Sequence, residues 1–240
     1  SLSEAYSFWP LMRSLCLTLA FVVFYAVLPF ISLSTAGAGI YMAPIFVAIL
    51  SAFVIGEPVR RWGWVGVFMG FAGVLVMLQP GSDAFTIFAV MPLISAAFYA
   101  LGHIITRTRC QNVAVEAMSL SLNTLMSLAG VLISIGLLLW TPSSDLTEAY
   151  PYILGNWSSV DLQNGLFVVL LAVFAVLIGM ALAGAYQAAP PATVATFEYS
   201  YLVFAATWDI LFFSIAPTFM SVTGMVMIVA AGILVMRGGK

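Results

Sequence analysis

Two acidic residues, Glu198 and Asp209, lie within one long apolar stretch of the chain, 191–213. If that stretch crosses a bilayer, a charged acid near its centre costs on the order of 2.5–3.5 kcal/mol. Keeping a carboxyl with an unperturbed pKa of about 4.3 protonated at pH 7 costs roughly 3.7 kcal/mol. Because the two costs nearly balance, a modest change in hydration shifts the proton. Such an acid is suited to be a proton site or the partner of a substrate ammonium.

Helical spacing relates the two acids to each other. Eleven residues at 100° each return to within about 20°, so an unbroken helix places Glu198 and Asp209 on one stripe, with Tyr201 on or beside it. Asp209 lies about 16 Å further along the axis and next to Trp208, which favours the outer interface. We expect Glu198 to face a functional cavity rather than to be a packing acid. For Asp209, a packing role is favoured over proton coupling.

The elements that must position these residues are eight apolar stretches, most of them long enough to cross a hydrocarbon core of about 30 Å. The chain is 63% hydrophobic and 7% charged, whereas soluble domains are about a quarter charged. Several stretches are apolar all round, unlike soluble amphipathic helices. We therefore predict an all-α polytopic membrane bundle of eight transmembrane helices rather than a soluble helical protein. The stretches are 11–31, 36–55, 62–79, 84–105, 113–140, 163–186, 191–213 and 216–236.

The positive charges indicate the orientation. All seven Lys and Arg residues fall on one side once the eight stretches alternate across a bilayer. Short loops rich in these residues stay cytoplasmic, so both ends of the chain are predicted to be cytoplasmic in a cell (inner) membrane, with the 141–162 loop outside. So few cations also argue against a nucleic-acid partner. The clusters are Arg13, Arg60 with Arg61, Arg107 with Arg109, and Arg237 with Lys240.

A weak internal repeat appears at an offset of 159 residues. It aligns Pro58 with Pro217, and the segment 73–77 (Gly-Val-Leu-Val-Met) with 232–236 (Gly-Ile-Leu-Val-Met). The offset spans five helices, an odd number, so the two copies enter the membrane with opposite orientation. Inverted repeats of this kind are typical of secondary transporters.

Several motifs together resemble the EamA repeat of the drug/metabolite transporter superfamily. In the first copy they are 43–48 (Ala-Pro-Ile-Phe-Val-Ala), 56–58 (Gly-Glu-Pro) and 64–77, and in the second 195–200 (Ala-Thr-Phe-Glu-Tyr-Ser) and 232–236. The resemblance implies ten helices in two inverted five-helix repeats that move small metabolites by alternating access. On that pattern, 1–81 corresponds to the last three helices of the first repeat and 84–237 to the whole second repeat. The chain departs from the pattern by lacking the first two helices, and by having Ile215 and Ala216 where the first copy has Gly56 and Glu57.

The repeat pairs the helix at 36–55 with the helix at 191–213, so we expect the cavity between them. His103, near the cytoplasmic end of its span, is expected to be an interfacial structural residue, with a titrating gate as the alternative. Glu57, at the cytoplasmic turn, is expected to pair with Arg60 or Arg61. The predicted substrate-binding residues are Glu198, Tyr199, Tyr41, Pro44 and Tyr201, with Tyr186 and Gln187 at the cytoplasmic mouth of the cavity.

Three functional classes compete for this chain. An intramembrane enzyme needs a nucleophile–base pair or metal ligands, and a single histidine without an acidic cluster does not supply them. A non-transporting scaffold or channel-like subunit remains the alternative. We predict a secondary active carrier of small metabolites such as amino acids or related amines, with protons as a candidate coupling ion and with no enzyme activity, cofactor or metal.

Overall fold

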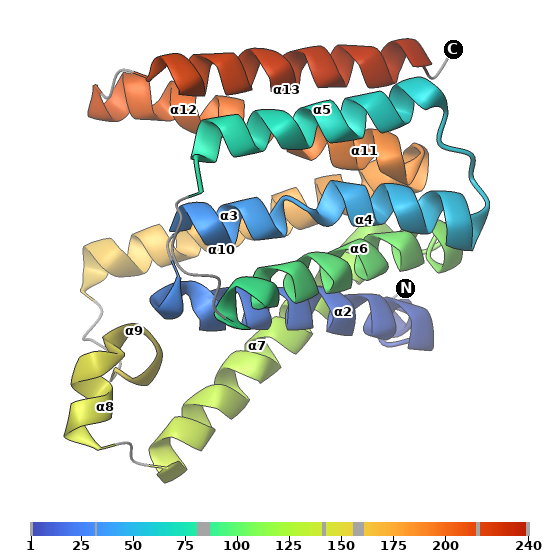
Figure 1. The fold of residues 1–240 in the computed structure, drawn as a ribbon. Coiled ribbons are helices and arrows are strands. Elements are labelled where there is room, and N and C mark those ends of the chain that lie inside the picture. The colour runs from blue at the N-terminus through green and yellow to red at the C-terminus, as the bar shows by residue number, and fades with distance from the viewer. Residues whose placement is uncertain are drawn as a thin grey trace.

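In the computed structural model, every regular element of the described part of the chain is a helix, as the sequence predicts (Figure 1). The first half begins with the short α1 and the long α2, which ends in a 3₁₀ turn. A broken pair, α3 and α4, follows and ends in a π-helical turn before α5. The described residues are 2–31, 33–80, 87–140, 143–155, 161–214 and 217–238. The bounds are α1 Leu2–Ala5, α2 Phe8–Val27 with Leu28–Phe30, α3 Leu33–Ile40, α4 Ala43–Leu50 with Ser51–Ile55, and α5 Arg61–Leu78.

The second half contains two long helices, α7 and α10, which are joined through the short helices α8 and α9. A second broken pair, α11 and α12, precedes the last helix, α13. The bounds are Ile87–Val90 (a 3₁₀ turn), α6 Met91–Arg109, α7 Val115–Trp140, α8 Ser144–Ala149, α9 Pro151–Leu154, α10 Leu162–Ala188, α11 Pro191–Glu198, α12 Ser200–Phe213 and α13 Phe219–Gly238.

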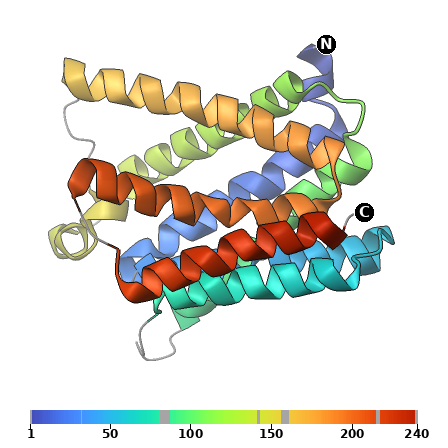
Figure 2. The same cartoon turned by 90° about the horizontal axis from the view of Figure 1, so that it is seen from above.

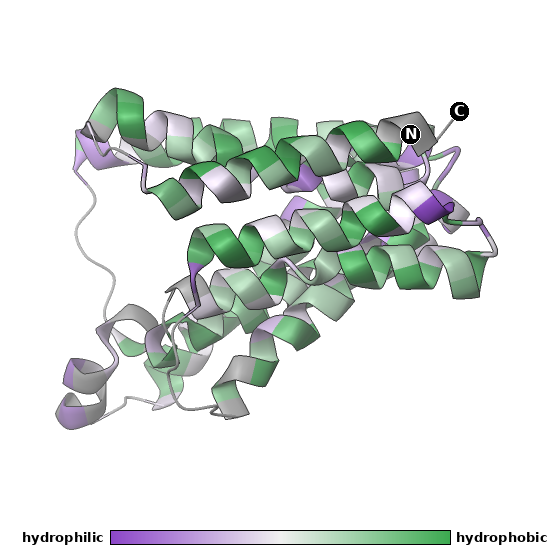
Figure 3. Ribbon diagram, turned by 45° about the horizontal axis from the view of Figure 1, so that its top comes forward, coloured by the Kyte–Doolittle hydropathy of each residue, from purple (hydrophilic) through white to green (hydrophobic). Residues whose placement is uncertain are grey.

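The long helices have the surface of membrane spans. Side chains such as Leu138 and Leu139 on α7 are 75% and 82% exposed, and apolar colour covers most of the helical surface in Figure 3. An exposed apolar face of this length fits hydrocarbon rather than water. Over the described residues, five helical segments are long and apolar enough to cross a membrane, and a sixth, Phe219–Val235, is shorter. The five are Phe8–Phe30, Thr35–Ile55, Arg61–Leu78, Val115–Trp140 and Leu162–Ala188.

Both ends of the chain lie at one end of the bundle. The N-terminus, the C-terminus and the link 56–60 are together there, and α8 and α9 lie at the opposite end (Figures 1 and 2). We call the first the termini end and the second the α8 end. That the termini end faces the cytoplasm stays a prediction, because it depends on the charge distribution.

Two helices are interrupted at matching depths. The first break is at Tyr41 and Met42, between α3 and α4, and the second is at Tyr199, between α11 and α12. Pro44 accounts for the first, since it has no N–H to donate to the carbonyl of Ile40. The two breaks also contact each other: the Tyr199 hydroxyl donates to the carbonyl of Tyr41 over 3.3 Å. A backbone carbonyl freed in the membrane interior is therefore satisfied by the other break.

The second break falls between the two acids of the expected stripe. The N–H of Leu202 bonds to the carbonyl of Tyr199, three residues back, so the α-helical ladder is interrupted after Glu198. Tyr199 itself keeps a right-handed helical conformation, at φ −59° and ψ −24°. That Glu198 and Asp209 share one stripe stays a prediction. Asp209 lies in α12, and its side chain is outside the described residues.

Helices α5 and α13 pack side by side over most of their length, in antiparallel directions (Figures 1 and 2). Glycines make this approach close: a Cβ added at Gly224 would lie 2.6 Å from the carbonyl oxygen of Gly73. A Cβ at Gly70 would lie 2.5 Å from the ring of Tyr199. The small residues of α5 thus provide room for a neighbouring helix and for the tyrosine at the second break, the use of small residues expected between membrane helices.

Candidate functional site

Glu198 is the last residue of α11, directly before the break at Tyr199. Its Oε1 accepts a hydrogen bond of 2.6 Å from the hydroxyl of Tyr186, on α10. Its Oε2 accepts one of 2.9 Å from the hydroxyl of Tyr99, on α6. A carboxylate is an acceptor at both oxygens, and two phenol donors match that form. Three helices therefore meet at one acid.

Aromatic rings support this acid from the side of the termini end. His103, one turn after Tyr99 on α6, stacks on the Tyr186 ring at 4.0 Å between centroids and meets the edge of Tyr99 at 4.4 Å. The imidazole is 1% exposed, and neither of its nitrogens has a hydrogen-bond partner. His103 thus belongs to the core around Glu198. The interfacial position expected for it is wrong, because the rings of Tyr99 and Tyr186 cover the imidazole.

A cavity of about 500 Å³ lies beside the acid, between α2, α3, α5, α6 and α12. It is lined by the C-terminal half of α2, the end of α5 and the first half of α6, which all lie toward the α8 end. Tyr99 belongs to both features, because its ring lines the cavity and its hydroxyl bonds to Glu198. The aromatic lining residues are Phe21, Phe24, Tyr25, Tyr41, Tyr99 and Tyr201.

The predicted site residues divide into two groups. Tyr41 and Tyr201 line the cavity, on opposite broken helices, as expected for a cavity between 36–55 and 191–213. Tyr199 and Pro44 are buried and do not line it. Tyr199 packs against Val74 and Ile228 in the core, while Pro44 begins α4.

Tyr186 and Gln187 are consecutive in the chain but lie in different surroundings. Tyr186 is fully buried and bonds to Glu198, so the structure places it inside the site rather than at an open mouth. Gln187 lies at the termini end, where its amide nitrogen donates to the carbonyls of Cys110 (2.6 Å) and Val113 (2.8 Å). The end of α10 therefore connects the acid with the surface of the bundle.

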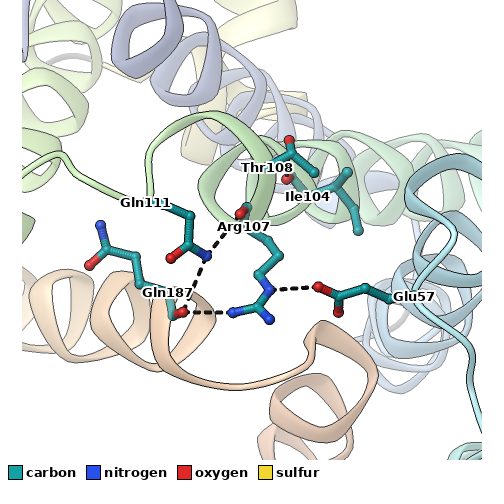
Figure 4. A network of polar contacts seen from close by, with 6 residues as sticks. All are labelled: Glu57, Ile104, Arg107, Thr108, Gln111 and Gln187. Atoms are coloured by element: carbon teal, nitrogen blue, oxygen red, sulfur yellow. Dashed lines mark hydrogen bonds and ion pairs between the residues drawn. The ribbon is translucent and has the colours of Figure 1, made fainter.

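An ion pair joins α6 to the link after α4 at the termini end. Nε of Arg107, on α6, donates to Oε1 of Glu57 over 2.9 Å, and its Nη1 donates to the carbonyl of Gln187 over 2.7 Å (Figure 4). We call Glu57, Arg107 and Gln187 the latch. The expected pairing of Glu57 with Arg60 or Arg61 is wrong: Gly56, at φ 78°, turns the chain after the π-helical segment, and Glu57 points toward α6.

Two contacts of the candidate site and its surroundings had no clear signal in the sequence. Tyr99 is one aromatic residue within an apolar run, and nothing local marks it as a partner of Glu198. Arg13 marked orientation only, yet it is 1% exposed and donates to Oγ1 of Thr106 over 2.8 Å and to the carbonyl of Met118 over 3.3 Å. Its position inward of the latch follows from the packing of α2 against α6 and α7.

Comparison with known proteins points to transport. Residues 7–79 match the EamA-like transporter family. The chain is 28% identical to a pseudopaline exporter of Pseudomonas aeruginosa over 96% of its own length and 75% of that protein. It is 24% identical to a riboflavin transporter of Brucella anthropi, over 81% of this chain and 64% of that protein.

Two further likenesses agree. An S-adenosylmethionine uptake transporter of Rickettsia prowazekii is 24% identical, over 86% of this chain and 64% of that protein. A solved crystal structure superposes with a TM-score of 0.70 at 17% identity, covering 99% of this chain and 91% of that chain, which shows a common fold. With the all-helical fold and the apolar spans, these likenesses show a multi-pass membrane transporter whose residues 7–79 are similar to the EamA-like transporter family.

Proposed function

We propose that the chain is a secondary carrier of small organic metabolites that works by alternating access, with Glu198 binding a proton or a cationic substrate group in turn. The observation that carries the proposal is the position of Glu198 between a cavity toward the α8 end and a closed latch at the termini end. A carrier needs a site in the middle and one closed side. A channel needs a continuous path instead.

The end of α10 supplies a physical link between the site and the latch. Tyr186 bonds to Glu198, and the next residue, Gln187, bonds across to the loop after α6 and accepts from Arg107. Binding of a proton or a cation at the carboxyl of Glu198 alters its hydrogen bond with Tyr186. Because Gln187 is the next residue of α10, this change displaces the latch contacts of Gln187. Binding in the cavity and opening of the termini end are thereby coupled through one short, rigid segment.

Proton and substrate compete for Glu198 in this scheme. Tyr99 of α6 and Tyr186 of α10 bond to the acid, and His103 packs on both of their rings. Arg13 of α2 bonds to Thr106 and Met118 instead. The two tyrosines and His103 are neutral at pH 7 when His103 is unprotonated, so a proton or a bound cation is what neutralises the carboxylate. The chain has no Gly-x-x-x-x-Gly-Lys phosphate loop, which favours an ion or substrate gradient as the energy source.

The cargo of the relatives supports a small organic substrate. Pseudopaline, riboflavin and S-adenosylmethionine are named for three of them. Since the three molecules differ, none of them can be assigned to this chain as its substrate. An acid next to the cavity, with no charged side chain among the residues that line it, favours substrates that carry an ammonium, such as amines and related metabolites.

The same proposal includes the division of the chain and its setting. Residues 1–81 and 84–237 form parts of two inverted repeats, supported by the two broken helices and by the antiparallel pair α5 and α13. The setting is the inner membrane, with the termini end cytoplasmic. Single cysteines at Ser144 and Gly239 should label from opposite sides of the membrane, and labelling of both from outside would contradict this topology.

Reversible cross-linking of the latch tests alternating access. In a background with Cys16→Ser and Cys110→Ser, Glu57→Cys and Gln187→Cys are joined by a reducible bifunctional thiosulfonate in proteoliposomes. The solute is taken from a screen of radiolabelled metabolites. Counterflow should stop on cross-linking and return on reduction, whereas each single cysteine treated alike should keep its rate. Counterflow that persists through the cross-link would show that the latch does not gate transport.

A further inference from the structure

The lining of the cavity, together with the one acid behind it, indicates a narrower substrate class. Aromatic rings come from three sides: Phe21 and Phe24 from α2, Tyr41 from the first break, and Tyr201 from α12. None of the residues that line the cavity carries a charge at pH 7. A volume of about 500 Å³ suits a small organic molecule with one ring. The cavity therefore offers ring faces and no ion-pairing group of its own.

The acid next to the cavity favours a cation, and neither nearby arginine lines the cavity. Glu198 lies behind Tyr99, which separates it from the cavity by one phenol group. The two arginines of this region are already engaged: Arg107 pairs with Glu57 in the latch, and Arg13 bonds to Thr106 and Met118. A substrate carboxylate would lose its hydration in the cavity without gaining a cationic partner, which is costly. An ammonium would face both ring quadrupoles and the acid.

We propose that the substrate is an organic cation with a flat aromatic or apolar body and no carboxylate, held by the ring faces of the cavity and by the charge of Glu198. This inference rests on the proposed carrier function and narrows its site. Of the substrate classes considered above, it excludes α-amino acids, because their carboxylate has no cationic partner in the cavity. Amines without a carboxylate remain.

Three compounds that share one ring separate the charge classes: 2-phenylethylamine is a cation at pH 7, L-phenylalanine a zwitterion, and 3-phenylpropanoate an anion. Binding to the purified full chain in detergent is measured by titration calorimetry, and counterflow is measured in proteoliposomes. We expect phenylethylamine to bind at least tenfold more tightly than phenylalanine, and phenylpropanoate not to bind. Equal or tighter binding of phenylalanine or phenylpropanoate, or no binding of phenylethylamine, overturns the inference.

Two substitutions test the two sources of selectivity. Phe24→Leu keeps an apolar side chain but removes a ring face, so the affinity for phenylethylamine should fall between about twofold and thirtyfold, while Phe24→Tyr keeps the ring and should lose less. Glu198→Gln keeps the shape of the acid and removes its charge, so the preference for the amine over phenylalanine should collapse. A preference that survives Glu198→Gln refutes the role of that charge. Leu166→Ala, on the exposed face of α10, is the matched control.

Failure of the cation inference can be distinguished from failure of the carrier proposal. The latch cross-link reports alternating access with any solute that shows counterflow. A chain that exchanges a zwitterion or an anion, and stops when the latch is cross-linked, remains a carrier with a different substrate class. A chain that binds phenylethylamine but ignores the cross-link has the proposed site without the proposed gate.

Discussion

The two ends of the bundle are built from different chemistry. Toward the α8 end, aromatic rings surround an uncharged cavity. At the termini end, Glu57, Arg107 and Gln187 close the bundle with an ion pair and backbone hydrogen bonds (Figure 4). Glu198 lies between them, bonded to one residue of each surrounding: Tyr99, which lines the cavity, and Tyr186, next to the latch.

The contacts of the latch are individually weak. The side chains of Arg107 and Glu57 are 23% and 32% exposed, so solvent screens their attraction and the pair contributes about 0–1 kcal/mol. The hydrogen bonds to the Gln187 carbonyl and from its amide add about 0.5–1.5 kcal/mol each. The sum is a few kcal/mol, the size of a free-energy gap that keeps a second conformation populated. In the proposed carrier, water replaces these contacts when the termini end opens.

The largest effect is expected where the two ends meet. Glu198→Gln should reduce counterflow at pH 7 about 30-fold or more, because it removes a buried charge on which the substrate depends. It should also abolish the pH dependence: in the native chain a proton competes with the cation, so substrate binding strengthens as the pH rises.

Glu198→Asp, which keeps the charge on a shorter stem, is the control and should retain a pH-dependent rate. Counterflow with an unchanged pH profile in Glu198→Gln would reduce Glu198 to a packing residue. Glu198 would then not connect the cavity with the latch.

The next effect concerns the latch alone. Arg107→Gln should raise the labelling rate of Cys110 by a small-molecule maleimide roughly tenfold in a Cys16→Ser background. Cys110 is 0% exposed, and its carbonyl accepts from Gln187. Burial raises the pKa of the Cys110 thiol, so the closed latch suppresses both access and the reactive thiolate.

The exchanged pair Glu57→Arg with Arg107→Glu serves as the control, and it should restore slow labelling. An unaltered Cys110 rate in Arg107→Gln would mean that the ion pair does not hold this end closed.

A smaller effect should separate the two tyrosines on the acid. Tyr99→Phe and Tyr186→Phe each remove one hydrogen bond to Glu198, which costs about 0.5–1.5 kcal/mol, or up to roughly tenfold in substrate affinity. Only Tyr186→Phe should also change Cys110 labelling, because Tyr186 adjoins Gln187 in the chain. Identical labelling rates in the two variants would argue against α10 as the link between site and latch.

The smallest effect is expected at Gln111. Its amide donates to the Gln187 carbonyl over 3.2 Å from an exposed position (Figure 4), and such a contact is worth only a few tenths of a kcal/mol. Gln111→Ala should therefore change Cys110 labelling less than threefold. A change as large as that of Arg107→Gln would place the main closure at Gln111 rather than at the ion pair.

The sequence by itself determined the class of the molecule and predicted Glu198 as its central residue. Apolar stretches of membrane length specify helices, since the backbone has no other partners in lipid. The offset of 159 residues related two helices that prove to be broken within one residue of the same repeat position, Tyr41–Met42 and Tyr199. Glu198 could be identified because an acid in an apolar run is costly wherever it lies. These inferences depend on local composition and spacing alone.

Only the tertiary structure decided which side chains meet. Tyr99 is 99 residues before Glu198, and Arg107 is 50 residues after Glu57. Helical periodicity relates residues within one helix, whereas these contacts depend on how separate helices pack. The break at Tyr199 had the same origin, since no proline inside 192–208 marked it. The hydroxyl of Tyr199 and the carbonyl of Tyr41 satisfy each other there, a compensation between two helices that neither helix encodes alone.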